Sequence, residues 1–332
     1  VLAVKYRVTN EKGEMSGGPM YYIERGLNMK WMAVLFAVFG VLASFGIGSS
    51  VQSNSVAQAI QTSFDINPWI TGVGLTILTG IVVLGGIQSI SKASSYIVPF
   101  MAIVYVAGGL AIICLHFDKV GPAIELICRS AFGLDAVMGA TVGMAVRYGV
   151  ARGVFSNESG MGSAPIAAAA AKTDHPSRQA LVSMTGTFLD TIVVCSITGI
   201  VLVIGGLYQT SGESGAALTS HTFNDLLPGP GGWLVTFGLI FFAYSTILGW
   251  CYYGEKCASY LGGERIVPVY RIIYVVSVLL GAGVNLGLVW AASDVFNGLM
   301  AVPNLIALLL LSNVIVAETK DFIMKRRSGE LP

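Results

Sequence analysis

The sequence is poor in charged residues. Asp, Glu, Lys and Arg make up only 11% of its 332 residues, whereas soluble domains carry about 25%. The net charge of +1 gives no basis for nucleic-acid binding. Hydrophobic residues account for 54% of the chain, and the mean hydropathy is +0.73. The shortage of charge therefore excludes an ordinary soluble domain and favours a membrane protein.

Cysteine and histidine are scarce as well. The cysteines are scattered without a CxxC pair, and the histidines lie at the ends of apolar segments. We interpret the cysteines as small apolar packing residues and expect neither a disulfide framework nor a metal cluster. The chain also lacks an initial Met and a signal-peptide pattern, and Val1–Arg7 resembles the end of a membrane helix. These features predict an internal fragment of a longer protein.

What the sequence has instead is a series of continuous apolar runs. Most are about twenty residues or longer, the length that an α-helix needs to cross a bilayer. We therefore predict an all-α, multi-spanning membrane protein with a single transmembrane domain over 1–332. Eight spans are expected, at about 31–59, 68–87, 96–116, 136–171, 180–206, 232–254, 268–290 and 294–318. The fourth is too long for one straight helix, and we expect it to be broken near 153–165.

The distribution of basic residues tests this layout. Fifteen of the 19 Lys and Arg residues fall in the connections on one side of the predicted spans, and only Lys119 and Arg129 fall on the other. Arg147 and Arg152 lie within the fourth span. Connections on the cytoplasmic side of a membrane carry an excess of Lys and Arg. The asymmetry therefore predicts that both ends of this chain lie in the cytoplasm, and we expect the protein in the plasma membrane.

The segment Gly153-Val-Phe-Ser-Asn-Glu-Ser-Gly-Met-Gly-Ser-Ala-Pro165 interrupts the longest apolar region. Glycine, proline and polar side chains continue an apolar helix poorly. Irregular backbone at membrane depth is tolerated only where protein buries it or where it lines a cavity, which favours a discontinuous helix at a binding site. The alternative is a surface loop between two short helices.

Polar and bulky side chains elsewhere in the spans complete a possible pocket. The hydroxyls of Ser245 and Thr246 are hard oxygen donors that suit a small cation such as Na⁺, and the amide of Gln52 can both donate and accept. Phe155 and Trp250 can form walls. Together they describe a site for a small zwitterion with a coupled ion. The alternative for most individual Ser and Thr residues in these spans is a hydrogen bond to a neighbouring helix. Phe155 and Trp250 are equally compatible with ordinary packing.

Charges inside predicted spans are costly and therefore point to structure or coupling. An ion pair between Arg152 and Asp190 would offset the desolvation of both, but Arg152 could also lie in water near the external mouth. Glu158 could carry a proton, bind a cation or accept hydrogen bonds from the interrupted backbone, and we favour the structural role. The last span contains Asn297, Pro303 and Asn304, which fit a kink with hydrogen-bonded amides.

Several motifs resemble the alanine/glycine:cation symporter family, part of the amino acid–polyamine–cation superfamily. The similarity runs along the whole chain, and the block Asn157-Glu-Ser-Gly-Met-Gly-Ser-Ala-Pro-Ile-Ala is the most specific part. The other matching motifs are Gly13-Glu-Met-Ser-Gly-Gly-Pro-Met-Tyr-Tyr22, Lys172-Thr-Asp-His-Pro176, Phe242-Ala-Tyr-Ser-Thr246 and Tyr253-Gly-Glu-Lys256.

The resemblance implies a LeuT-type fold of two inverted five-helix repeats, each opening with a discontinuous helix. It implies import of alanine or glycine coupled to Na⁺, or to H⁺ in some members, without an organic cofactor. The residues that correspond to the family's substrate contacts are Gln52, Phe155, Gly160, Thr246 and Trp250, and Ser245 with Thr246 would contribute to the Na⁺ site. Gly160 would let the substrate approach the backbone. Membrane lipid is an expected partner, and no obligate protein partner is evident.

The resemblance also implies about three further spans before Val1, which would make eleven and would supply much of the binding site. A channel would show symmetric repeats or rings of one residue type, and neither pattern is present. An intramembrane enzyme would need a metal cluster or a nucleophile with its base beside Glu158 and Asp190, and the sequence shows neither. We therefore expect a secondary transporter that works by alternating access, and not an enzyme.

Overall fold

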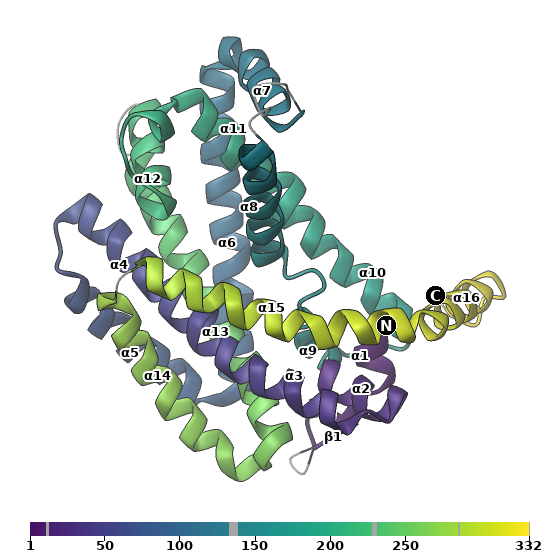
Figure 1. Ribbon diagram of the computed structural model, residues 1–332. Coiled ribbons are helices and arrows are strands. Elements are labelled where there is room, and N and C mark those ends of the chain that lie inside the picture. The colour runs from purple at the N-terminus through teal and green to yellow at the C-terminus, as the bar shows by residue number, and fades with distance from the viewer. Residues whose placement is uncertain (11–12, 133–138, 228–230, 285, 332) are drawn as a thin grey trace.

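The computed structural model describes residues 1–10, 13–132, 139–227, 231–284 and 286–331, which form helices over most of their length (Figure 1). The N-terminal part contains α1 (Leu2–Lys5), the antiparallel strands β1 (Val8–Thr9) and β2 (Met15–Ser16), and α2 (Pro19–Leu27). Gly18 precedes α2 with φ 129°, and Pro19 then occupies the first turn, where its missing N–H is not needed.

The first long helical path joins α3 (Lys30–Ala43), the π-helical segment η1 (Ser44–Ser50) and α4 (Val51–Phe64). It covers the predicted span 31–59. Ser49 and Ser50 both donate to the carbonyl of Phe45, at 2.7 Å each, within the widened turn. The path ends at Asp65, whose left-handed φ of 54° turns the chain toward α5 (Pro68–Leu84).

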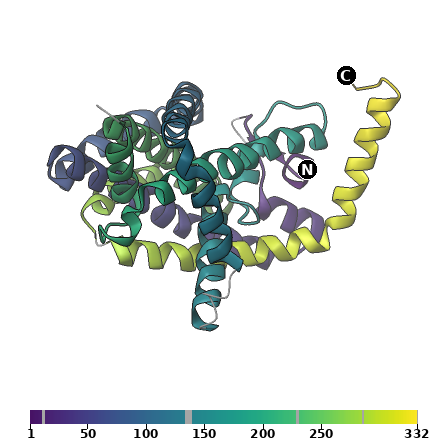
Figure 2. The ribbon, with the colours of Figure 1, turned by 90° about the horizontal axis from the view of Figure 1, so that it is seen from above.

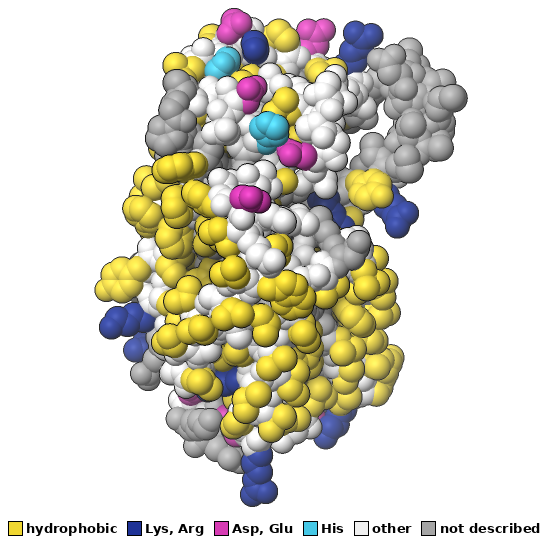
Figure 3. Space-filling model, turned by 90° about the vertical axis from the view of Figure 1, so that its left-hand side faces the viewer, with side chains coloured by type: hydrophobic (Ala, Val, Ile, Leu, Met, Phe, Trp, Pro, Cys, Tyr) yellow, Lys and Arg dark blue, Asp and Glu magenta, His cyan; other side chains and the backbone are white. Residues whose placement is uncertain are grey.

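Helices α5 and α14 (Val267–Gly283) pack side by side and expose apolar side chains at helical spacing. On α5 the exposed residues include Ile70, Val73, Ile77 and Ile81, while the opposite face is buried. A helix that is apolar on both its buried and its exposed face suits a lipid environment. Figure 3 shows hydrophobic side chains over the middle and lower part of this face, with charged side chains of both signs near its top and around its lower edge.

A second group of helices packs around Tyr105, Val201 and Phe223. It consists of α6 (Gly86–Leu115), α7 (Phe117–Phe132), α11 (Ser196–Gly205), the short η4 (Leu207–Gln209) and α12 (Gly215–Leu226). Helix α11 continues a path that begins with α10 (Pro176–Thr187) and a second π-helical segment, η3 (Phe188–Cys195).

The longest helix, α13 (Gly231–Gly262), contacts α3, η1, α4, α6, α12 and α14 and is central to the packing. Its Ile247, Leu248 and Cys251 are fully buried. After it come η5 (Glu264–Ile266), α14, α15 (Leu286–Leu310) and α16 (Ser312–Arg327). Figure 2 shows α16 turning sharply away from α15, at the position of Leu311.

The fourth predicted span consists of α8 (Gly139–Asn157) and α9 (Ala164–Ala169), separated by the segment 158–163. Six helical paths in the described part of the chain are long and apolar enough to cross a membrane: Lys30–Phe64, Lys92–Leu115, Pro176–Gly205, Thr236–Gly262, Glu264–Gly283 and Gly287–Leu310. α5 is a shorter apolar helix. The protein is thus a multi-pass helical membrane protein, while the eight spans and the LeuT-type repeat stay predictions.

Two helix ends differ from the predicted ranges for physical reasons that hydropathy does not reveal. α14 ends at Gly283 inside the range 268–290, where Asn54 donates to the carbonyls of Gly281 (3.1 Å) and Val284 (2.8 Å) and so satisfies groups that a helix end leaves unpaired. The range 294–318 likewise crosses the bend at Leu311.

Glycines allow the first path to approach α13 closely. A Cβ built on Gly48 would overlap the side chain of Trp250, and one on Gly40 would lie 2.7 Å from the sulfur of Cys257. Small residues at such contacts are the usual means by which membrane helices pack tightly.

We expect Gly48→Ala to destabilise the protein by about 1–3 kcal/mol, because the overlap with Trp250 outweighs the better helix propensity of alanine. Gly74→Ala on α5 is the matched control, since a Cβ there meets no atom within 4 Å. Thermal unfolding of the detergent-purified variants measures both effects. Equal midpoints for the two variants would contradict the close contact.

Candidate functional site

The segment between α8 and α9 is held in an unusual backbone conformation. Glu158, Gly160 and Gly162 have φ values of 54°, 82° and 96°. Glycine adopts such values freely, whereas a side chain makes them costly. The glutamate therefore occupies a position whose strain must be offset by its contacts.

Side chains from distant parts of the chain satisfy the polar groups of this segment. Asn304 of α15 donates to the carbonyl of Gly160 at 2.8 Å, and the Tyr22 hydroxyl of α2 donates to the Asn304 carbonyl oxygen. Asn157 accepts from the N–H of Ser159 at 3.0 Å. The interrupted backbone is thus bound to α15, and α2 holds the Asn304 side chain that binds it. The amide of Asn304 is hydrogen-bonded as expected for a kink, whereas the Asn297 amide oxygen is buried without a partner among the described residues, so the expectation is wrong for Asn297.

The carboxylate of Glu158 has polar neighbours on two sides. Ser163 donates to it at 2.8 Å across the interruption. The Trp250 indole and the Tyr253 hydroxyl of α13 lie near enough to interact with it electrostatically. The donor is a side chain and not one of the interrupted backbone N–H groups, so the structural role that we favoured for Glu158 stays a prediction. Trp250 is only 1% exposed and packs in the core with Phe36 and Met161.

The five predicted substrate contacts do not share one cavity. Gln52 and Thr246 line a cavity of about 360 Å³ between α4, α11, α12 and α13. Phe155 lines one of about 260 Å³ between α8 and α15, and Gly160 lines one of about 390 Å³ near α1 and α10. Trp250 lines none of these three cavities.

The two hydroxyls proposed for Na⁺ differ in their surroundings. Ser245 and Thr246 both donate to the carbonyl of Phe242, at 2.8 Å and 3.0 Å. Only Thr246 lines the cavity that contains Gln52, while the Ser245 hydroxyl faces the sulfur of Met101 at 4.0 Å. Because the hydrogen of the Thr246 hydroxyl is engaged by its own helix, its oxygen lone pairs are available to a cation in the cavity.

The partner of Arg152 differs from the one that we considered. Its guanidinium forms an ion pair with Asp294 of α15, not with Asp190. It also lies 4.3 Å above the ring of Trp290, which in turn stacks on Phe155 with centroids 4.7 Å apart. Both charged side chains remain partly exposed. A charged pair and two aromatic rings therefore join α8 to α15 beside the Phe155 cavity.

Asp190 belongs to a different polar group. It lies in the π-helical segment η3 and accepts from the Ser156 hydroxyl at 2.8 Å. Asn157 donates to the neighbouring Thr191 at 3.0 Å. The last turn of α8 is thus bound to η3, which holds the entry to the interruption in place.

From the sequence we identified neither Asp294 nor Trp290 as a partner of Arg152, and we assigned Asn304 only to a kink. An aspartate near the start of the last apolar run was a usable signal, because charges are rare in such runs. Asn304 follows Pro303 within an apolar helix, which was read as a kink. Nothing in the sequence indicated that its amide reaches Gly160.

The chain was compared with known proteins. The family model described as the sodium:alanine symporter family matches residues 1–332. The sodium/alanine symporter AgcS of Methanococcus maripaludis is 56% identical over 329 residues, which cover 97% of this chain and 72% of that protein. YrbD of Bacillus subtilis, named as a putative sodium/proton-dependent alanine carrier protein, is 37% identical over a stretch that covers 99% of this chain and 71% of YrbD. GlnT of the same organism, named as a probable sodium/glutamine symporter, is also 37% identical, and the match covers 100% of this chain and 69% of GlnT.

The full-length family match and the multi-pass helical fold with its interrupted helix agree with one another. The chain belongs to the sodium:alanine symporter family, whose members are membrane transporters and not enzymes.

Proposed function

We propose that the protein imports a small neutral amino acid, alanine or glycine, together with Na⁺ by alternating access across the plasma membrane. The observation that carries the proposal is the family match over the whole chain. The interrupted helix at 158–163 and the cavity shared by Gln52 and Thr246 support it, because transporters of this kind bind their cargo at helix breaks and polar groups within the membrane.

In this proposal the residues act in two groups. Gln52 and Thr246 provide the polar contacts, with the Thr246 oxygen facing the coupled ion. Phe155, Gly160 and Trp250 bound the amino acid, so that a larger side chain clashes. Since these groups lie apart in the described conformation, we propose that closure around the cargo brings α8 and its break toward α4 and α13.

The ends of the described chain are proposed to face the cytoplasm, because 15 of the 19 Lys and Arg residues fall on that side of the predicted layout. Surrounding lipid would contact the exposed apolar faces of α5 and α14.

H⁺ is the alternative coupling ion, and the partly buried carboxyl group of Glu158, which lines the same cavity as Gly160, gives it a specific residue. Uptake of radiolabelled alanine into proteoliposomes of the full-length protein, under an imposed Na⁺ or pH gradient, separates the two. We expect the Na⁺ gradient to drive uptake and the pH gradient alone to drive none. Uptake driven only by the pH gradient would replace Na⁺ with H⁺, and no uptake under either gradient would refute the symport proposal.

We expect Thr246→Ala to lower Na⁺-dependent alanine uptake by about tenfold, because it removes an oxygen from the cavity that contains Gln52. Ser245→Ala is the matched control: it removes the same hydroxyl and the same bond to Phe242, but its side chain does not line that cavity. The apparent affinity for Na⁺ in proteoliposomes is the measurement. Similar losses in both variants would show that the hydroxyls act only on the helix.

We expect Glu158→Ala to destabilise the protein by about 1–3 kcal/mol, because the Ser163 hydroxyl loses its acceptor across the break. Glu158→Gln keeps one acceptor oxygen and should retain more stability and Na⁺-driven uptake. Thermal unfolding and uptake are measured on the same preparations. If Glu158→Gln abolishes uptake while its stability matches that of the unsubstituted protein, Glu158 takes part in coupling instead.

A further inference from the structure

Three hydroxyl groups lie on one face of α14. Tyr270, Tyr274 and Ser277 are spaced by four and three residues, which places them on the same side of the helix. That side faces the π-helical segment η1 and α13, both of which α14 contacts. Both tyrosines are buried, whereas the exposed face of α14 is apolar. The buried hydroxyls therefore need hydrogen-bond partners on the neighbouring helices.

The partners differ along this polar stripe. The hydroxyl of Tyr274 donates to a backbone carbonyl of another helix, that of Ile247 in α13, at 2.7 Å. The two outer hydroxyls are hydrogen-bonded to serine side chains of η1, Tyr270 to Ser44 at 2.9 Å and Ser277 to Ser49 at 2.7 Å. Within the stripe, Tyr274 is thus the residue that holds the main chain of α13.

Ile247 belongs to the turn of α13 that carries two residues of the proposed transport site. Thr246 precedes it directly, and Trp250 follows within the same turn. The Tyr274 hydroxyl also lies against η1, because a Cβ built on Gly48 would be 2.9 Å from its oxygen and would overlap Trp250. The hydroxyl is therefore located where η1, α13 and α14 meet.

The same junction extends to Gln52. Its amide donates to the carbonyl of Ile47 in η1 at 3.1 Å, directly before Gly48. Gln52 and Thr246 line one cavity, and the backbone that holds each of them lies beside Tyr274. Close-packed interiors transmit small displacements. A change in the spacing of η1 and α13 would therefore change the distance between the two polar side chains of the cavity.

We propose that Tyr274 is a positioning residue for transport: its hydroxyl sets the spacing between η1 and the 246–250 turn of α13, and thereby between Gln52 and Thr246. The inference rests on the proposed function, because it concerns the affinity of the same cavity. Tyr274 does not line that cavity, so it acts on the cargo and on Na⁺ only through the residues that do. A tyrosine suits this role because it joins a large rigid ring to one hydrogen-bonding group.

Tyr274→Phe removes the hydroxyl and keeps the ring, and its effect is measured on the full-length protein in proteoliposomes. We expect the half-saturating concentrations of Na⁺ and alanine to rise about fivefold, as for the loss of one hydrogen bond, while the maximal rate stays within about twofold. Calorimetric titration with alanine in detergent, with Na⁺ present, should show the same loss of affinity without the transport cycle.

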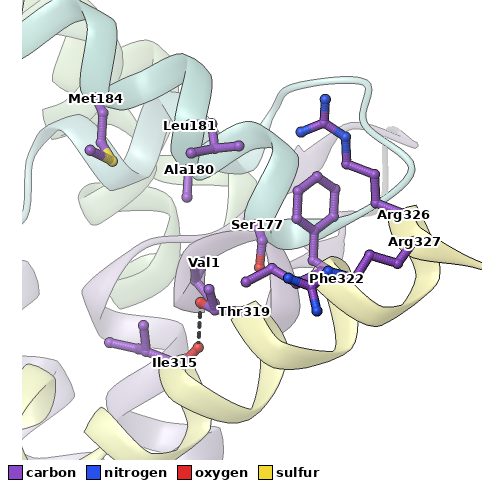
Figure 4. Close-up of a pocket in the computed structure, with 11 residues that line it drawn as sticks. Val1, Ser177, Ala180, Leu181, Met184, Ile315, Thr319, Phe322, Arg326 and Arg327 are labelled. Atoms are coloured by element: carbon purple, nitrogen blue, oxygen red, sulfur yellow. Dashed lines mark hydrogen bonds between the residues drawn. The ribbon is translucent and has the colours of Figure 1, made fainter. Parts of the chain in front are cut away.

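Two variants control for the loss of a buried hydroxyl. Tyr270→Phe removes the same group one turn earlier in α14. Ser177→Ala removes a hydroxyl that donates to the carbonyl of Glu318 at 3.1 Å, which is again a bond to the backbone of another helix. Figure 4 shows Ser177 facing α16, and it lines none of the three cavities that contain proposed transport residues. We expect both variants to lower the thermal midpoint as Tyr274→Phe does and to leave the half-saturating concentrations within about twofold.

The double variant Tyr274→Phe/Thr246→Ala tests whether Tyr274 acts through Thr246. We expect it to bind Na⁺ no more weakly than Thr246→Ala alone, because residues that share one interaction are not additive. Additive losses, or an equal rise in the half-saturating concentrations of Tyr270→Phe or Ser177→Ala, would overturn the inference while the proposed function stands. If the unsubstituted protein neither takes up alanine under a Na⁺ gradient nor binds it, the proposed function fails and the inference fails with it.

Discussion

A polypeptide that interrupts its helix inside a membrane must find protein partners for the exposed backbone groups, because lipid offers none. The segment 158–163 depends on this constraint more than any other part of the structure. Asn304 binds its carbonyl group, Ser163 bridges it through Glu158, and Asn157 closes its first turn. The helices that carry these side chains therefore have to lie where they do for the break to exist.

The same constraint recurs at a second helix end. Asn54 of α4 binds the terminal carbonyls of α14, in the way that Asn304 of α15 binds Gly160. Both amides are buried. Their NH₂ groups bind backbone carbonyls that would otherwise remain unpaired, which offsets part of the cost of burying a polar side chain. The Asn54 amide oxygen has no partner among the described residues. A buried amide in a membrane helix is therefore explained by the backbone groups that it binds where another helix ends or is interrupted, and does not by itself indicate a substrate contact.

The sequence was sufficient for the fold class and for the existence of the break. Long apolar runs and the deficit of charge predicted membrane helices, and the glycines between 153 and 165 predicted the interruption. It was insufficient for the partners. The ion pair of Arg152 with Asp294 and the bond from Asn304 to Gly160 join positions 142 and 144 residues apart. Hydropathy carries no information about such long-range contacts. Hydropathy also predicts that the helix of 268–290 continues past Gly283. In the structure α14 ends at Gly283, where Asn54 binds its terminal carbonyls.

Trp250 lies between two features that were described separately. On one side its Cβ and the start of its ring leave no room for a Cβ at Gly48, within the π-helical segment of the first long path. On the other side its indole lies beside Glu158 in the break. One rigid aromatic side chain therefore lies against both the backbone at 44–50 and the break at 158–163, which are more than a hundred residues apart in the sequence. A change of shape in either segment has to be accommodated by Trp250.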